Sequence, residues 1–216
     1  MTSARTIVFG ATGMVGREVL DICLCSNDIE SVTAIGRRKS GLEHPKLLEV
    51  EHDDFTDYGR IESKLSEVDL CLYCLGVYQG QVSREKFWEI TVDYLDALIK
   101  TLEKTSPGIR FCLFSAQGAS QSERSLMRFA NAKGRAENLL LESQLAEKYL
   151  FRPGYIKPGP NYLNKTVSAK MFEPVYRLFP AIGVDSPVLA RAMVEVGLHG
   201  YEKTVLENSD LRAFGS

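Results

Sequence analysis

The sequence lacks any excess of positive charge. Its 216 residues include 26 Lys and Arg against 28 Asp and Glu, which gives a formal net charge of -2. Nucleic-acid-binding domains usually carry a basic patch, and membrane-surface helices carry a block of Lys or Arg. The sequence has neither, so we expect no nucleic-acid partner and no membrane partner.

Long apolar runs are also missing. No stretch approaches the roughly 20 apolar residues that span a bilayer. The N-terminus lacks the charged leader and apolar stretch that are typical of a signal peptide. We therefore expect a cytoplasmic protein.

Cysteine and histidine are scarce. The five cysteines are an odd number, which argues against a disulfide framework. Cys71 and Cys74 form a C-x-x-C pattern inside an apolar run that favours a buried strand. Residues three apart on a strand point to opposite faces, so we interpret both as buried small hydrophobic residues. The histidines, His44, His52 and His199, have no metal-ligand spacing, and we expect no metal site.

Strand-like and helix-like segments alternate along most of the chain. Short apolar runs predict strands, and apolar residues recurring with helical spacing predict helices. The expected strands are Thr6–Phe9, Ser31–Ile35, Lys46–Glu51, Asp69–Leu75, Ile109–Phe114 and Tyr149–Arg152. The expected helices are Met14–Cys25, Ile61–Val68, Arg84–Lys104, Leu126–Leu145 and one from Ser186 to about Gly197 to Gly200. This alternation predicts an α/β fold, a Rossmann-type doubly wound parallel sheet with helices on both faces.

One domain is expected to span residues 1–216, because this length suits a single large domain. Residues 155–216 are less regular and are punctuated by prolines. Their loop Lys157–Tyr162 follows the sixth predicted strand. We expect residues 155–216 to contribute a small substrate lid.

A glycine-rich loop, Gly10–Gly16, follows the first predicted strand and opens the first predicted helix. In dinucleotide-binding sheets the first glycine permits a tight turn, the second lets the pyrophosphate approach, and the third lets helix and strand pack closely. The helix N-terminus adds free N–H groups and the positive end of its dipole. The same glycines would also suit a tight turn without a ligand. The predicted cofactor-binding positions are Gly10, Thr12, Gly13, Met14, Val15 and Gly16.

The end of the second predicted strand indicates which dinucleotide binds. A carboxylate there would hydrogen-bond the adenosine 2′-hydroxyl and select NAD. This chain has Arg37 and Arg38 instead. Guanidinium groups suit a phosphate, so NADP(H) is favoured over NAD(H). A solvated basic turn is the alternative, because surface arginines are common.

Several motifs occur in one order along nearly the whole chain. They are G-A-T-G-M-V-G at Gly10–Gly16, G-R-R at Gly36–Arg38, H-D-D-F at His52–Phe55, C-L-G at Cys74–Gly76, S-A-Q-G-A at Ser115–Ala119, K-G-R-A-E at Lys133–Glu137 and F-R-P-G at Phe151–Gly154. Together they resemble the short-chain dehydrogenase/reductase superfamily, in its atypical or extended, epimerase-like branch. They are especially similar to the small Tat-interacting-protein-like oxidoreductases. The resemblance is specific for fold and cofactor, and far less so for substrate.

The resemblance implies further cofactor contacts. Asp54 and Phe55 would border the adenine, and Leu75 and Gly76 would lie along the ribose-phosphate path. Pro153, with the glycine after it, would lie near the nicotinamide. From the residues alone, Asp54 could equally cap the following turn and Phe55 could be core.

The resemblance also implies a catalytic set with one member missing. The family uses a serine after the fifth strand and a tyrosine four residues before a lysine, whose charge eases the ionisation of the tyrosine. Ser115 and Lys133 match, but Phe129 stands at the tyrosine position. Ser115, a water or another tyrosine would have to supply the proton; Tyr78 and Tyr155 follow the fourth and sixth predicted strands and could approach the nicotinamide, or they could simply be pocket walls. Ser115 also suits a turn, and Lys133 a solvated helix position.

Two functions stay open, since fold does not fix function. The first is an NADP(H)-dependent oxidoreductase or epimerase-like protein that acts on a small carbonyl or alcohol and is impaired by Phe129. The second is a catalytically silent, dinucleotide-sensing regulatory protein. The resemblance further suggests a homodimer through helices Arg84–Lys104 and Leu126–Leu145.

Overall fold

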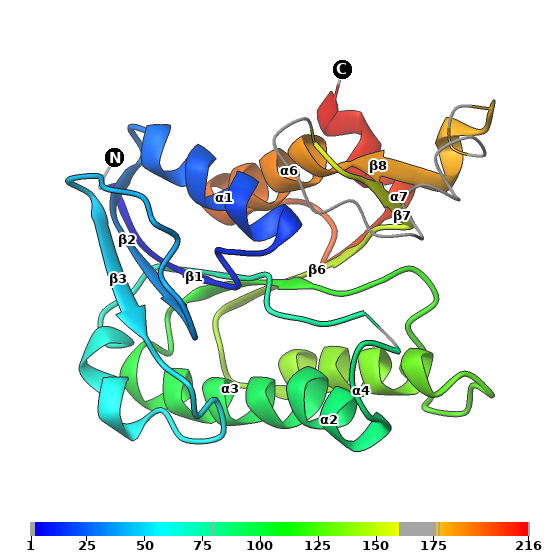
Figure 1. Ribbon diagram of the computed structural model, residues 1–216, viewed down its shortest axis with the longest axis horizontal. Helices are drawn as coiled ribbons and strands as arrows, with labels where there is room; N and C mark the ends of the chain where they lie inside the picture. Colours follow the sequence, from blue (N-terminus) through cyan, green and yellow to red (C-terminus); the bar gives the residue numbers. More distant parts are fainter. Residues whose placement is uncertain (1–2, 79, 160–175, 177, 216) are drawn as a thin grey trace.

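A seven-stranded parallel sheet forms the middle layer of the computed structural model, which describes residues 3–78, 80–159, 176 and 178–215 (Figure 1). The strand order is β3-β2-β1-β4-β5-β6-β9, with every neighbouring pair parallel. The strands are β1 Ala4–Phe9, β2 Ile29–Gly36, β3 Leu47–Glu51, β4 Leu70–Tyr73, β5 Arg110–Phe114, β6 Glu147–Arg152 and β9 Val205–Glu207. The order reverses direction between β1 and β4. The Rossmann-type α/β fold predicted from the sequence is confirmed.

Helices cover both faces of this sheet. Helices α1 (Met14–Cys25) and α6 (Ser186–His199) lie on one face, and α2 (Arg84–Trp88), α3 (Tyr94–Thr105) and α4 (Arg128–Glu142) lie on the other (Figure 1). A π-helical turn, Glu89–Asp93, joins α2 to α3. The helix predicted over Arg84–Lys104 is therefore continuous but carries a π insertion. Such insertions are frequent at functional sites.

The helix expected over Ile61–Val68 is wrong in type and extent. A 3-10 helix, Gly59–Lys64, occupies this region instead. Glu67 adopts a φ of 55°. This left-handed conformation is incompatible with a continuing α-helix for a residue with a side chain, so the segment stops before β4.

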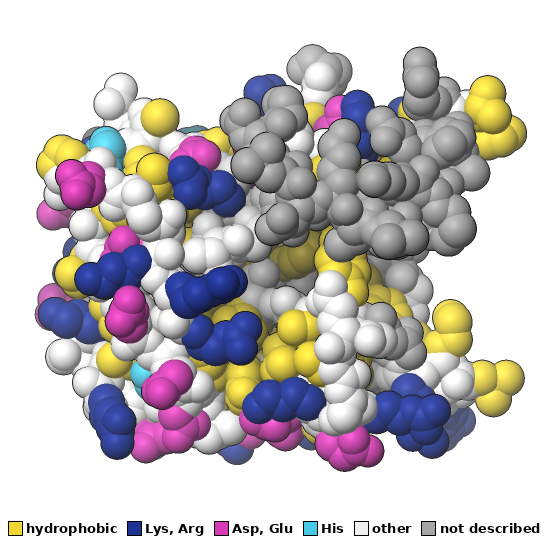
Figure 2. Space-filling model, in the orientation of Figure 1, with side chains coloured by type: hydrophobic (Ala, Val, Ile, Leu, Met, Phe, Trp, Pro, Cys, Tyr) yellow, Lys and Arg dark blue, Asp and Glu magenta, His cyan; other side chains and the backbone are white. Residues whose placement is uncertain are grey.

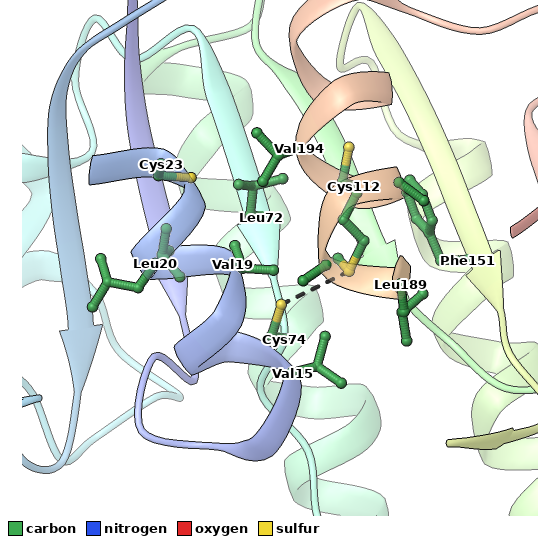
Figure 3. Close-up of a cluster of buried hydrophobic side chains, with 14 of the residues drawn as sticks. Val15, Val19, Leu20, Cys23, Leu72, Cys74, Cys112, Phe151, Leu189 and Val194 are labelled. Atoms are coloured by element: carbon green, nitrogen blue, oxygen red, sulfur yellow. Dashed lines mark hydrogen bonds between the residues drawn. The ribbon is translucent and has the colours of Figure 1, made fainter. Parts of the chain in front are cut away.

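Two apolar clusters fill the spaces on the two faces of the sheet. Figure 3 shows the first, where Val15, Val19 and Cys23 of α1 meet Leu72 of β4 and Leu189 of α6. Cys71 belongs to the second cluster and Cys74 to the first, and both thiols are free. The expectation that the C-x-x-C pair points to opposite faces is confirmed.

The described part of the C-terminal region contributes to the helix layer and to the edge of the central sheet. Helix α6 packs on α1, and β9 pairs with β6 at the edge of the sheet. The short strands β7 (Tyr155–Lys157) and β8 (Gly183–Asp185) form a second parallel pair, and α7 (Asn208–Arg212) follows β9. Pro160 to Tyr162 of the expected lid loop lie outside the described residues.

Candidate cofactor and active site

A cavity of about 520 Å³ opens at the carboxyl ends of the central strands. Figure 2 shows the corresponding face as a hollow with apolar side chains, and with Lys and Arg side chains beside it. This volume lies within the range typical of cofactor sites. Its walls are Gly10 to Gly16, Ala34 to Arg38, Ser40, Glu49, Phe55, Cys74 to Tyr78, Gln81, Phe114 to Ala116, Phe129, Lys133, Pro153, Gly154 and Ile156. All predicted site residues except Asp54 are among them.

The glycine loop leaves no room for side chains where it turns. Gly10 has a φ of 77°, and a Cβ there would lie 2.7 Å from the carbonyl oxygen of Cys74. A Cβ on Gly16 would lie 2.1 Å from the carbonyl oxygen of Gly10, so loop and helix touch through bare backbone. A Cβ on Gly13 would meet the same oxygen at 3.2 Å. Gly10 and Gly16 thus shape the turn, whereas Gly13 lies at the cavity wall.

Helix α1 presents an uncapped N-terminus to this cavity. Gly13 is its N-cap, no side chain caps it, and its first turn holds no acidic residue. The first N–H groups of a helix have no intrahelical partners. These groups and the helix dipole suit a phosphate. The loop therefore fits the pyrophosphate of a dinucleotide.

Arg37 and Arg38 line the cavity at the end of β2, and both are exposed. Within the part of the chain that the structure describes, neither forms an ion pair. Sequence reasoning missed Glu49 on β3, which lines the same end and accepts a hydrogen bond from the backbone N–H of Ser40. The end of the cavity that suits an adenosine ribose thus carries two guanidinium groups, which have no ion-pair partner among the described residues, and one carboxylate.

Asp54 and Phe55 have different surroundings although they are adjacent. Phe55 lines the cavity and stacks on Tyr94 with ring centroids 5.3 Å apart. Asp54 is exposed and accepts hydrogen bonds from the backbone N–H of Thr56 at 3.0 Å and from its hydroxyl at 2.6 Å. These bonds lower the pKa of Asp54. Asp54 caps the turn, which was the alternative from the residues alone, and it does not line the cavity.

Ser115 follows β5, and its hydroxyl is committed to a buried carboxylate. The Ser115 hydroxyl donates to Glu137 Oε1 at 2.6 Å. Arg152 Nε donates to the same oxygen at 2.8 Å, its Nη2 donates to Oε2, and Gln121 Nε2 donates to Oε2 at 3.0 Å. A hydroxyl has one proton and two lone pairs. Toward the cavity, Ser115 can therefore accept a hydrogen bond but cannot donate one while this bond is made.

Lys133 on α4 is the only lysine among the described residues that line this cavity. Its Nζ donates to the carbonyl oxygen of Phe114 at 3.3 Å and lies 5.7 Å from the centroid of the Phe114 ring. Burial lowers the pKa of the Lys133 ammonium to about 8, and the nearby Glu137 carboxylate partly offsets this effect. A group with a pKa near neutrality is suited to give and take protons.

Phe129 lies one helical turn before Lys133 and also lines the cavity. Its ring packs beside Phe87 with centroids 6.0 Å apart. The position at which the resembling family carries a catalytic tyrosine is thus at the cavity, but it holds no hydroxyl. Phe129 and Lys133 share one face of α4, as their spacing predicts.

The fold and this site define a Rossmann-type protein with a cavity suited to a dinucleotide. A family model described as NAD(P)H-binding matches residues 10–174, so the chain belongs to the NAD(P)H-binding family. Its sequence is 27% identical over 232 residues to Protein fmp52-2, mitochondrial, of Aspergillus oryzae, covering 100% of this chain and 97% of that protein. It is 28% identical over 160 residues to Protein HTATIP2 of Rattus norvegicus, covering 72% of this chain and 64% of that protein. The predicted relationship to atypical short-chain dehydrogenases/reductases is confirmed.

Solved structures support the same fold. A short-chain dehydrogenase/reductase from Saccharomyces cerevisiae superposes with a TM-score of 0.70 at 15% identity, covering 98% of this chain and 99% of that one. The Bordetella bronchiseptica enzyme WbmG, solved in complex with NAD, gives a TM-score of 0.71 at 14% identity, covering 95% and 72%. Over the described ranges, no helix is long and apolar enough to cross a membrane.

Proposed function

We propose that the protein is an NADP(H)-dependent oxidoreductase that acts on a small carbonyl or alcohol and is slowed by Phe129. One observation carries this proposal: a single cavity is lined by the glycine loop at one end and by Ser115 and Lys133 at the other. A dinucleotide bound across it would lay its pyrophosphate on α1. Its reactive ring would then lie beside the two polar side chains.

The preference for NADP(H) over NAD(H) rests on the arginine pair. Arg37 and Arg38 are exposed at the cavity and, among the described residues, have no carboxylate partner. A guanidinium forks two hydrogen bonds onto a phosphate. Glu49 acts in the opposite sense, because a carboxylate repels a phosphate and accepts from a ribose hydroxyl. We propose that Arg37 and Arg38 favour NADP(H) more strongly than Glu49 favours NAD(H). The Glu49 carboxylate already accepts a hydrogen bond from the Ser40 N–H.

The residues at the Ser115 and Lys133 end of the cavity transfer the proton of the reaction. NADPH supplies a hydride when it is bound. We assign the proton donor to Lys133, because Ser115 gives its proton to Glu137 and Phe129 has none to give; the hydroxyl of Tyr78, which also lines the cavity, is the alternative donor. Ser115 then accepts a hydrogen bond from the product hydroxyl or from the nicotinamide amide. In the oxidative direction the neutral amine of Lys133 takes the proton back.

The substrate is proposed to be small and partly apolar. Leu75, Val77, Phe114, Phe129 and Ile156 line the cavity, and its polar side chains beyond the glycine loop include Tyr78, Gln81, Ser115 and Lys133. Apolar walls stabilise a substrate by burying its apolar surface. A carbonyl compound with one hydrocarbon or aromatic side fits this chemistry better than a free sugar.

A dinucleotide sensor is the second candidate, and Phe129 is the observation that favours it. Proton transfer by a positioned acid typically contributes roughly 10² to 10⁴ in rate. A chain that keeps the phosphate loop and loses the phenol could bind the dinucleotide without useful turnover. The two candidates differ in the response to a restored hydroxyl.

The test compares the wild type with Phe129→Tyr on a panel of carbonyl compounds, with NADPH oxidation as the signal. We expect slow or undetectable wild-type turnover and at least about a tenfold gain in the variant, or about 1.4 kcal/mol of transition-state stabilisation. The ring already fits at this position, so the change adds only a hydroxyl. Phe87→Tyr is the matched control, because it adds the same hydroxyl to the neighbouring ring, which does not line the cavity.

Two results would contradict the proposal. Brisk wild-type turnover with a harmless Lys133→Ala change would place the proton route elsewhere. A folded Phe129→Tyr variant that binds NADPH but gains nothing on any carbonyl would favour the sensor.

Location and partners stay proposals. Relatives from Aspergillus oryzae and Candida albicans carry the name mitochondrial, so the cytoplasmic location needs cell fractionation to test it. We propose a homodimer through the face formed by α2, α3 and α4. Trp88 on α2 and Leu126 and Met127 before α4 are exposed large apolar side chains. Light scattering of the purified protein would distinguish the dimer from a monomer.

A further inference from the structure

A second, smaller cavity lies behind Lys133 and is lined by a tyrosine that the proposed reaction does not use. Its volume is about 10 Å³, and Tyr73, Leu75, Thr91, Leu113, Phe114, Ser115, Lys133 and Ala136 line it. Leu75, Phe114, Ser115 and Lys133 also line the large cavity, so the two spaces share one wall. Lys133 therefore lines both cavities.

The Tyr73 hydroxyl is buried and has no hydrogen-bond partner among the described residues. Tyr73 ends β4, only 2% of it is exposed, and burial raises the pKa of its phenol, which keeps it neutral. A buried hydroxyl without a partner loses its hydration without compensation and so destabilises the fold. Buried polar groups in native proteins almost always find a partner, often an ordered water.

The small cavity has the size and the polar walls that one water requires. A water needs roughly 10–15 Å³ of such space and two to four polar partners. Tyr73 supplies a hydroxyl, and the half-buried Lys133 supplies an ammonium with three donors, of which Phe114 takes one. Thr91, 8% exposed and within the π-helical turn, adds a third polar side chain.

We infer that one buried water bridges Tyr73 and Lys133, with Thr91 as a further partner, and that Tyr73 positions the lysine through it. The water accepts from the ammonium and donates to the phenol oxygen or to Thr91. It holds Lys133 through a contact in the smaller cavity. The water site is inferred from packing alone. Its use as a proton supply for Lys133 rests on the proposed function.

The test is made without cofactor or substrate, so its outcome is independent of any reaction. Tyr73→Phe removes only the hydroxyl. With a bridging water, we expect the equilibrium constant for urea unfolding to rise about fivefold, the usual worth of one hydrogen bond. Without a water, the change removes an unsatisfied polar group, so the same constant falls. Thr6→Val is the matched control, because Thr6 Oγ1 is also buried and unpartnered but does not line this cavity.

A double-mutant cycle separates positioning of Lys133 from a general packing effect. Tyr73→Phe and Lys133→Met are combined, and the product of their separate effects on the unfolding constant is compared with the combined effect. A shared water predicts a combined effect at least about threefold smaller than that product. A crystal structure would show the water within hydrogen-bonding distance of Tyr73 Oη and Lys133 Nζ. An unchanged or lower unfolding constant for Tyr73→Phe, strictly multiplicative effects in the cycle, or an empty cavity in a well-ordered map would each overturn the inference.

Discussion

Replacing Lys133 by methionine should remove a specific pH dependence from the stability of the folded chain. Burial lowers the pKa of Lys133 from its ordinary 10.5 to about 8 in the folded state. At about 1.4 kcal/mol per pKa unit, this difference corresponds to at most about 3.5 kcal/mol. Methionine keeps most of the aliphatic stem and removes the charge.

The sign follows from proton binding in the two states. Below pH 8 Lys133 is charged in both states, and the full cost of holding its charge in the fold is present. Between about pH 8 and 10.5 the unfolded chain binds more protons than the folded chain, so the free energy of unfolding rises with pH. Relative to Lys133→Met, the free energy of unfolding of the wild type should therefore rise by up to about 3.5 kcal/mol across this window.

Urea unfolding of both proteins at several pH values between 7 and 11, without cofactor, measures this difference. Subtracting the Lys133→Met curve from the wild-type curve removes the contributions of groups that titrate in both proteins to the free energy of unfolding. Lys100→Met, which removes an exposed lysine paired with Asp96 on α3, controls for the loss of one positive charge. Parallel curves for wild type and Lys133→Met through this window would refute the reasoning, because the ammonium would then be as well solvated in the fold as outside it.

Three further predictions concern the cofactor site and its glycine loop. Arg37→Ala should weaken NADPH binding by about tenfold to a hundredfold, the worth of a charge-assisted contact, and leave NADH binding nearly unchanged; equal wild-type affinities in calorimetric titrations of both cofactors would contradict this. Gly13→Val should abolish binding in a chain that still folds, because its side chain would occupy pyrophosphate space and its Cβ meets one backbone oxygen at 3.2 Å. Gly16→Ala should instead lower the melting temperature, since its Cβ would lie 2.1 Å from the Gly10 oxygen. Undiminished binding by folded Gly13→Val, or a Gly16→Ala melt like that of the wild type in circular dichroism, would show that the loop is looser than the backbone indicates.

Local patterns were sufficient to predict the fold class and most of the elements of the central sheet. The predicted helix Met14–Cys25 and the observed α1 have the same bounds, because a glycine loop and an amphipathic repeat define that segment without help from the rest of the chain. Strand β9 was not predicted. It is three residues long and becomes a strand only by pairing with β6, which is information that a short stretch of sequence does not contain.

The site could be predicted where it depends on neighbours along the chain and not where it depends on packing. Gly10 and Gly13 are recognisable because their spacing is fixed by one turn. Glu137 lies twenty-two residues from Ser115, and only the packing of α4 on β5 and β6 brings its carboxylate to that hydroxyl. Tyr73 appears as one more apolar strand residue until the small cavity beside Lys133 is seen.

The hydrogen-bond donors at the reactive end explain why Phe129 should slow the reaction and not stop it. Lys133 has three N–H donors. The Phe114 carbonyl takes one, and the bridging water that we infer in the small cavity takes another. One donor then remains for the large cavity. With a tyrosine at position 129, that donor could hold the nicotinamide ribose while the phenol served the substrate. With Phe129, ribose and substrate compete for the same N–H, because Ser115 has already given its proton to Glu137. Phe129→Tyr should therefore raise kcat and also tighten NADPH binding in the presence of a carbonyl ligand. A gain in kcat alone would mean that Lys133 never held the ribose.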